Sequence, residues 1–411
     1  MRLQPLGHLS EPSEYHDPPS GLEYKVVSHS LISRRALLVS SAAALSCARP
    51  KAERFLGYCF VANYDGHSIA AVDLTRFKTR QQIPLDAAPA QILARPKTTR
   101  AYALTPANGT IHEIEAGLLT VTRRVKAGND AISMRLSRNG DALWVLYRDP
   151  ASLVEVPFDT LRPARRIRLS SVPDDFDLSR EADNACVLSR RDRTLAIVSL
   201  ANAAVTRTIH SATEPTLARF RLDGRQLIAG SQADRSLTFY DVPTGKTIVR
   251  LPLALAPREF CFTSDGGQLY VTGDGMDAVV NVFPYRTEVW ETLLAGHSPG
   301  VMATAEPAKP PYYLLIANPD TDTVTVLDIE SGKLVALVTV GSGPGQIVLT
   351  PNREYALVLN EKSGDMAVIR IFSLGGNQVG GQRVKRYKSA PLFTMIPVGE
   401  RPVSAAVVSL T

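Results

Sequence analysis

An internal repeat with a period of 42 residues constrains this chain more than any other feature. Each copy contains one strongly apolar segment, and the segments centre on Val61, Ala103, Val145, Val187, Ala229, Val271, Ile316 and Val358. Successive centres are 42 residues apart, apart from one spacing of 45 between Val271 and Ile316. A Pro-rich insertion at residues 306–311 (EPAKPP) accounts for the longer spacing. A repeat this regular indicates that one supersecondary unit occurs eight times.

Each copy has the pattern of short β-strands rather than of helices. Apolar residues alternate with a period of two, as in residues 323–328 (TVTVLD), and Gly, Pro, Asn and Asp bound the runs. Asn139-Gly140 and Asp223-Gly224 indicate tight hairpins, because these pairs adopt the positive φ angles that such turns need. A unit of about 40 residues with four strands is typical of a β-propeller blade. The sequence therefore predicts an all-β fold, a single β-propeller of four-stranded blades.

The two ends of the repeat array complement one another. We name the strands of a blade a to d from the centre outward. The first copy begins with a b-type strand at residues 58–62, whereas residues 401–410 form an extra inner strand at the C-terminus. We expect this last strand to complete the first blade and close the ring, which removes exposed strand edges. The count is then eight blades, with seven as the alternative if residues 174–210 do not form a blade.

The first 50 residues differ in kind from residues 51–411, which hold the propeller. Residues 1–30 lack a periodic apolar pattern, which is typical of a disordered extension. Ser33-Arg34-Arg35 then precedes an apolar, Ala-rich stretch that ends at Leu45, and the paired arginines resemble the twin-arginine export motif. About ten apolar residues are too few to span a bilayer as a helix. We therefore expect an exported protein of the periplasm, cell envelope or exterior.

Cys47 stands at the end of this signal, in Ala44-Leu45-Ser46-Cys47. This segment is a weak match to a lipoprotein box, because Ala44 stands three residues before the cysteine where the box favours Leu. Two alternatives stay open: a lipid tether through Cys47, or cleavage near Ala48 that leaves no anchor.

Several strands carry a family motif. Residues 270–273 (YVTG), 60–63 (FVAN) and 315–318 (LIAN) resemble the strand that names the YVTN-repeat β-propellers, and residues 324–328 (VTVLD) and 340–345 (VGSGPG) match the same repeat. The resemblance extends over residues 57–411 and is most specific in the last three copies. It implies an exported bacterial propeller of the YncE-like and surface-layer type, related more distantly to haem d1 propellers and propeller lactonases. Seven blades are common in that group, so eight would depart from its usual pattern.

Candidate binding residues belong to the d–a and b–c loops. Because successive strands run in opposite directions, these loops gather on one face of the ring, around the central channel. Loops on a rigid scaffold are where binding groups concentrate, although Asp and Asn also serve as turn residues. The predicted ligand-binding residues on this channel face are Asp65, His67, Asp130, Asp174, Asp175, Glu214, Arg258, Glu259, His297 and Arg401.

The pattern of a metal centre, a haem centre or a nucleophile is absent from the sequence. The histidines of the repeats fall in four different copies, at His67, His112, His210 and His297, and neither CxxCH nor HExxH occurs. The cysteines of the repeats also lie in separate copies, so we expect buried thiols rather than disulfides at Cys59, Cys186 and Cys261. We therefore expect neither a cofactor nor a metal.

These observations favour a monomeric, non-catalytic propeller that binds an unidentified protein or small molecule at its channel face. The alternative is an enzyme, a lactonase-like hydrolase or an oxidoreductase-related propeller, with a divalent metal or cofactor at the channel mouth. Its ligands would be drawn from Asp65, Asp130, Asp174, Asp175 and Glu214. The formal charge of +6 belongs to the part of the chain after residue 47, which has basic clusters at residues 162–168, 190–193 and 383–388. Basic clusters can bind nucleic acid, but we expect no such partner for an exported protein.

Overall fold

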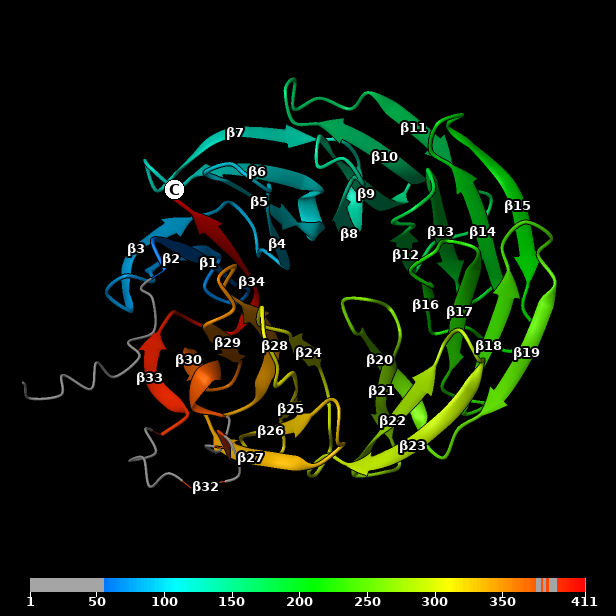
Figure 1. Cartoon of the computed structure of the whole chain (residues 1–411). Coiled ribbons are helices and arrows are strands. Elements are labelled where there is room, and N and C mark those ends of the chain that lie inside the picture. The colour runs from blue at the N-terminus through cyan, green and yellow to red at the C-terminus, as the bar shows by residue number, and fades with distance from the viewer. Residues whose placement is uncertain (1–54, 375–377, 380–381, 384–389, 411) are drawn as a thin grey trace, which may run out of the picture. The chain divides into compact units, whose positions relative to one another are not determined.

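Eight four-stranded antiparallel sheets form a ring in this protein (Figure 1). The structure is a computed structural model, and it describes residues 55–374, 378–379, 382–383 and 390–410. Within these residues the fold is an all-β propeller, and the prediction of eight blades is confirmed. Helical turns among them are confined to two 3₁₀ segments, Pro106–Asn108 and Ile371–Ser373.

In each of the first four blades, the strands succeed one another from the channel outward in the order a to d. Blade 1 contains β34 (Pro402–Ser409), β1 (Gly57–Asn63), β2 (Ser68–Asp73) and β3 (Lys78–Pro84). Blade 2 contains β4 (Gln91–Ala94), β5 (Arg100–Thr105), β6 (Thr110–Glu115) and β7 (Thr120–Lys126). Blade 3 contains β8 (Asn129–Leu136), β9 (Ala142–Asp149), β10 (Ala151–Pro157) and β11 (Arg165–Arg168). Blade 4 contains β12 (Asp175–Leu178), β13 (Asn184–Ser189), β14 (Thr194–Ser199) and β15 (Ala204–His210).

The other four blades follow the same order. Blade 5 contains β16 (Leu217–Phe220), β17 (Gln226–Ser231), β18 (Ser236–Asp241) and β19 (Thr247–Pro252). Blade 6 contains β20 (Ala256–Phe262), β21 (Leu269–Asp274), β22 (Ala278–Phe283) and β23 (Glu288–Leu294). Blade 7 contains β24 (Met302–Ala305), β25 (Tyr313–Asn318), β26 (Thr323–Asp328) and β27 (Leu334–Thr339). Blade 8 contains β28 (Pro344–Leu349), β29 (Tyr355–Asn360), β30 (Asp365–Arg370) and β33 (Leu392–Pro397), with a small hairpin of β31 (Gln378–Val379) and β32 (Gln382–Arg383) before its last strand.

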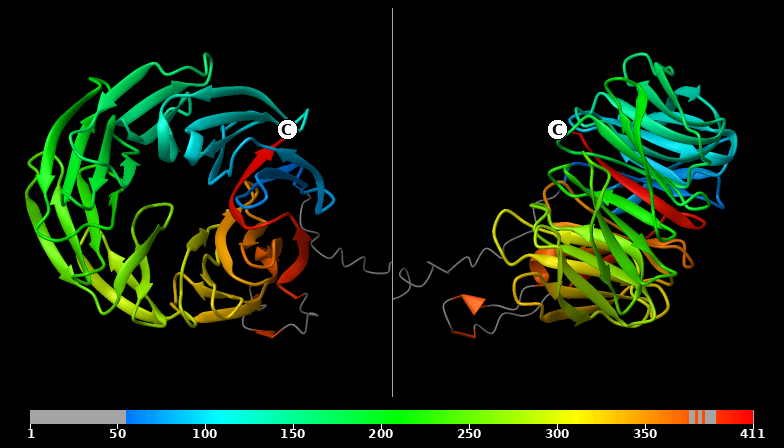
Figure 2. Two further views of the ribbon diagram at one scale, coloured as in Figure 1. Left: turned by 180° about the vertical axis from the view of Figure 1, so that it is seen from behind. Right: turned by 90° about the vertical axis from the view of Figure 1, so that its right-hand side faces the viewer.

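The C-terminal strand closes the ring as predicted. Strand β34 pairs antiparallel with β1, and Ala405 lies opposite Val61. Figures 1 and 2 show this red strand beside the blue N-terminal strands, at the inner edge of the first blade. Residues 175–210 form a complete blade 4, so the alternative of seven blades was wrong. The Pro-rich insertion lies between β24 and β25, where it lengthens an a–b turn without adding a strand.

Apolar packing between neighbouring blades holds the ring together. One cluster joins Val61 and Val72 of blade 1 to Leu357 and Val368 of blade 8, and all four side chains are fully buried. Burial of such a side chain stabilises the fold by about 1.5–3 kcal/mol. The b and c strands are buried almost throughout, because each is covered by a blade on both faces, whereas the d strands are largely exposed.

Within the described residues, the prediction of buried cysteines is confirmed for Cys59 and Cys186 but not for Cys261. Cys59, Cys186 and Cys261 are free thiols; the first two are buried and the third is half-buried. Burial raises the pKa of Cys59 to about 12, so this thiol stays protonated. Cys47 and the twin-arginine segment lie outside the described residues. In the part of the chain that the structure describes, no helix has the length and apolar character needed to cross a membrane.

Candidate functional site

The d–a and b–c loops meet on one face of each blade, and charged side chains of these loops and of the adjoining ends of strands a and b pair there. Arg401 Nη1 lies 3.6 Å from Asp65 Oδ1 in blade 1. Arg148 donates to Asp130 over 3.0 Å in blade 3. Arg258 donates to Asp274 over 2.9 Å in blade 6. Since both members of each pair are about half exposed or more, each pair contributes at most about 1 kcal/mol.

Three further contacts lie on this face, formed by Arg190 and His297. Arg190 donates to Glu214 over 3.1 Å, and its backbone N–H donates to Asp174 over 2.8 Å. His297 lies 3.0 Å from Asp277, and this carboxylate raises the pKa of the imidazole. Four of the predicted binding residues lie on inner strands and not in the d–a loops where we expected them, namely Asp130, Asp175, Arg258 and Glu259.

His67 differs from the other candidates on this face because the contact described for it involves its backbone and not its side chain. It occupies a turn with a positive φ of 44°. Its carbonyl accepts a hydrogen bond from the backbone of Leu85. The structure therefore gives this residue a part in loop geometry.

A cluster of charged side chains lies on the innermost strands of blades 3 to 6. Arg219 Nη1 donates to Asp175 Oδ2 over 2.5 Å. Arg135 lies 3.7 Å from both Asp175 and Asp177, and its Nε donates to the carbonyl of Phe176 over 2.7 Å. We call Arg135, Asp175, Asp177, Arg219 and Glu259 the inner-strand cluster. Figure 1 shows its strands β8, β12, β16 and β20 nearest the centre of the ring.

The members of this cluster influence one another's ionisation. Burial lowers the pKa of Arg219, but the carboxylates of Asp175, Asp177 and Glu259 outweigh that effect and raise the pKa. Burial raises the pKa of Asp177 against the opposing effect of Arg135 and Arg219. Two guanidinium groups therefore face three carboxyl groups. The side chains of Arg135 and Arg219 keep 32% and 28% of their surface exposed, so solvent and solutes reach the cluster.

The charges occupy one equivalent position in three successive blades. Arg135 lies opposite Trp144 of its b strand, and Asp177 and Arg219 hold the same register 42 and 84 residues later. The other blades carry apolar or thiol side chains at this position, namely Leu93, Cys261, Ala303, Val348 and Ala406. Our loop-based reasoning missed Arg135, Asp177 and Arg219, although the 42-residue register could have revealed them.

Between blades 8, 1, 2 and 3, neutral polar side chains link each inner strand to the inner strand of the next blade. Gln346 accepts a hydrogen bond from the backbone of Ala405, and Ser404 accepts one from Ile92. Gln91 bonds both the N–H and the carbonyl of Met134. These contacts satisfy backbone groups at the open edge of each inner strand. Blade-to-blade bonding therefore needs no charge, which sets the inner-strand cluster apart.

The carboxylates that would bind a metal under the enzyme alternative do not converge. Asp65, Asp130 and Glu214 belong to different blades or loops, and each pairs with its own arginine. Among the residues that the structure describes, no three His, Cys, Asp or Glu side chains form a group that could hold a metal ion. His112, the most buried imidazole, bonds Thr105 and lies 3.4 Å from Asp86 instead of facing the channel. The described carboxylates thus do not form the metal site of that alternative.

Comparison with known proteins supports the fold and no finer relationship. The chain matches neither a protein-family model nor a curated protein. Among solved structures it is similar to the dihydro-haem d1 dehydrogenase NirN in complex with DHE, with a TM-score of 0.69, 16% identity, and coverage of 88% of this chain and 78% of that one. This similarity shows the class of the protein, a β-propeller, and nothing about its activity.

Two further solved structures share the fold. Hydrazine synthase of Kuenenia stuttgartiensis has a TM-score of 0.53 at 19% identity, covering 69% of this chain and 95% of that one. A protein of unknown function from Desulfotomaculum acetoxidans has a TM-score of 0.58 at 10% identity, covering 86% and 99%.

Proposed function

We propose that this protein is an exported, non-catalytic β-propeller that binds a charged ligand at its channel face. The ligand is a small molecule or a charged segment of a partner protein. The observation that carries the proposal is the inner-strand cluster, in which charged groups replace apolar ones at one equivalent position of three consecutive blades. Charged groups removed from water cost free energy unless they are paired. Clusters of perturbed titratable groups in a concave site are typical of binding sites.

Three ion pairs of the channel face belong to the same part of the ring as this cluster. Arg258, Glu214 and Asp130 belong to blades 6, 5 and 3 or to the loops that lead into them, as the cluster does. Because exposed pairs are worth little individually, their side chains can exchange partners with a ligand at small cost. The predicted loop residues would then form the rim of the site, and the inner-strand cluster its floor.

Export and family membership belong to the same proposal. The twin-arginine-like segment at residues 33–45 supports export, and the YVTN-like strands support membership of the YVTN-repeat propellers. A fusion of residues 1–50 to a reporter, with and without Arg34→Lys and Arg35→Lys, tests export. Fractionation of a Cys47→Ala variant tests the lipid tether.

Native mass spectrometry of the gently purified protein tests ligand binding. We expect a bound mass that the Arg219→Met variant loses. Metal analysis and a lactone-hydrolysis assay test the enzyme alternative in parallel. Stoichiometric metal together with turnover would contradict the non-catalytic proposal.

A further inference from the structure

A Glu–Arg pair recurs on the outer strands of two blades. Glu113 lies opposite Arg123 in blade 2, and Glu155 lies opposite Arg165 in blade 3. Arg123 Nε donates to Glu113 Oε1 over 2.9 Å, and Arg165 Nη2 donates to Glu155 Oε1 over 2.7 Å. Each arginine also donates to carbonyls at the c–d turn of the next blade, those of residues 158–159 and 200–201.

Blade 4 keeps the arginine of this pair and lacks the glutamate. Arg207 lies opposite Ile197 in the same register. Ile197 is buried and packs in an apolar cluster with Cys186 and Tyr240. Within the described part of the chain, the Arg207 guanidinium has no hydrogen bond or ion pair that resembles those of Arg123 and Arg165. The positive charge of Arg207 helps to lower the pKa of Asp241. The Asp241 carboxylate, however, accepts its hydrogen bonds from Thr244 and not from Arg207.

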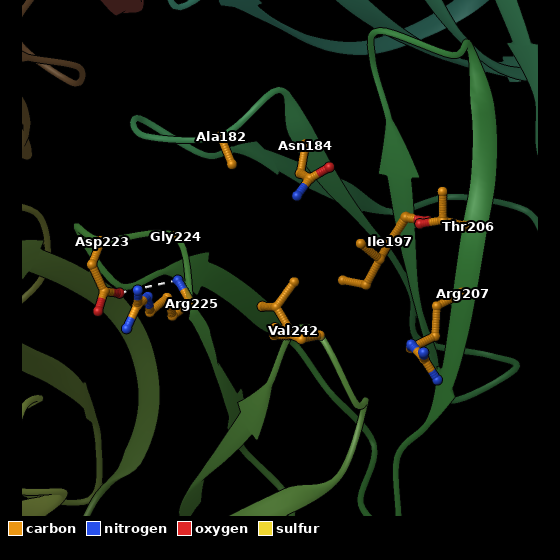
Figure 3. Close-up of a pocket in the computed structure, with 10 residues that line it drawn as sticks. Ala182, Asn184, Ile197, Thr206, Arg207, Asp223, Gly224, Arg225 and Val242 are labelled. Atoms are coloured by element: carbon orange, nitrogen blue, oxygen red, sulfur yellow. Dashed lines mark hydrogen bonds between the residues drawn. The ribbon is translucent and has the colours of Figure 1, made fainter.

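Arg207 borders a groove of about 460 Å³ between blades 4 and 5. Figure 3 shows Thr206 and Arg207 on one side of this groove and Asp223 and Arg225 on the other, with Asn184 also beside it. The Arg207 stem passes over the turn at Gly245, where an added Cβ would lie 2.7 Å from Cδ. Strands β13 to β15 of blade 4 line this groove together with a–b and c–d turns, which lie on the opposite face of the ring from the channel-face loops.

The groove between blades 4 and 5 differs in charge from the equivalent groove between blades 2 and 3. Arg207 and Arg225 line it together with one acid, Asp223. Asp223 is already neutralised by Arg221, which donates to both of its carboxylate oxygens over 3.0 and 2.5 Å. The counterpart between blades 2 and 3 has about 520 Å³ and is lined by two arginines and three acids, namely Arg100, Arg123, Glu113, Glu115 and Asp159. Of these two grooves of the described residues, the one between blades 4 and 5 has a surplus of cations.

We propose that the groove between blades 4 and 5 binds a carboxylate, which takes the place beside Arg207 that Glu113 and Glu155 take beside their arginines. A guanidinium presents a planar fork of donors that matches a carboxylate in two parallel hydrogen bonds. Asn184 and Thr206 line the same groove and add neutral polar groups for a ligand. The carboxylate belongs either to a small molecule or to an acidic side chain of another protein.

The test titrates the whole protein with two probes, sodium acetate and an end-blocked pentapeptide with one central glutamate, against sodium chloride at equal ionic strength. Binding is followed by the NMR signals of the arginine Nε–H groups. We expect saturable binding that weakens at least about tenfold in Arg207→Met. The Ile197→Glu variant supplies the missing carboxylate from the chain itself and should lose the binding to a similar extent. The Arg80→Met variant removes an exposed arginine of blade 1 and should bind as the wild type does.

The two probes distinguish the sources of the carboxylate. Arg207-dependent binding of acetate supports a small-molecule ligand, and Arg207-dependent binding of the peptide alone supports an acidic side chain of a partner. If Ile197→Glu does not fold, Arg207→Lys replaces it, because lysine keeps the charge but loses the fork and should bind more weakly than arginine. The proposal is overturned if neither probe binds, or if binding is unchanged in Arg207→Met.

Discussion

Arg219 donates a hydrogen bond to Asp175 over 2.5 Å and so joins the innermost strands of blades 4 and 5, although 44 residues separate the two in sequence. The equivalent contacts between blades 8, 1, 2 and 3 use glutamine and serine. A charged link is therefore not required to hold inner strands together. The charged side chains of the inner-strand cluster therefore make this part of the channel polar without being required for the fold.

Removal of this guanidinium should destabilise the protein. Arg219→Met leaves Asp175, Asp177 and Glu259 with Arg135 as their remaining cation. Breaking a fully buried ion pair costs about 3–5 kcal/mol, and the partial exposure of this one reduces the expected loss to about 1–3 kcal/mol. Urea unfolding measures the change. Arg258→Met is the matched control, because its pair with Asp274 is exposed and should contribute less than about 1 kcal/mol.

Acid should weaken the fold through Glu113. Burial opposes ionisation of this carboxyl, but hydrogen bonds from Arg123, Thr122 and Tyr102 outweigh burial and lower its pKa from 4.5 to about 2. A carboxyl with a depressed folded-state pKa binds its proton more weakly in the fold than in the unfolded chain. Its stabilisation is therefore present above pH 4.5 and is lost as the pH falls towards 2.

The expected loss for this group is about 3 kcal/mol. Unfolding free energies of the wild type and of Glu113→Gln, measured from pH 6 down to about pH 2, give the difference between the two proteins. That difference should shrink as the pH falls. A difference that stays constant across this range would contradict the account of Glu113.

His297 should titrate above the ordinary histidine range because of its neighbour. The hydrogen bond and the charge of Asp277 raise the pKa of the imidazole. Asp277→Asn removes the charge, so the pKa of His297 should fall towards 6.5. NMR titration of the histidine ring signals measures both values.

Gly273 should tolerate no side chain. Its position corresponds to Asn63, Asn318 and Asn360 of the other YVTN-like strands, but an added Cβ would lie 1.9 Å from the carbonyl oxygen of Ala256 on the adjoining inner strand. Gly273→Ala should therefore cost about 1–3 kcal/mol. Gly117→Ala is the matched control, since nothing lies within 4 Å of its added Cβ. Equal melting temperatures for the two variants would contradict the predicted steric conflict.

The sequence predicted the architecture well because every copy of the repeat has the same pattern of apolar and polar residues. Each blade buries the same alternating face, so Val61 and Val358 could be aligned before any contact was known. Closure by residues 402–409 followed from a missing inner strand at one end and a spare one at the other. A conclusion of this kind depends on pattern and not on the orientation of any single side chain.

The site was harder to predict from the sequence. Pairs such as Arg148–Asp130 depend on side-chain rotamers at the ends of two paired strands, which spacing does not determine. Arg135, Asp177 and Arg219 were overlooked because we considered loops and not inner strands. The strand register shows that Ile197 occupies the position of Glu113 and Glu155. Only this alignment reveals that Arg207 lacks a glutamate opposite it.

The central claim is that the inner-strand cluster binds a charged ligand. Thermal unfolding of the wild type, Arg219→Met and Arg80→Met, each with a panel of amino acids, dicarboxylates, polyamines and nucleotides, tests it most directly. We predict that at least one compound class raises the melting temperature of the wild type and of Arg80→Met by about 2 °C or more, and leaves that of Arg219→Met unchanged. An equal rise in all three proteins, or no rise in the wild type, would contradict the claim.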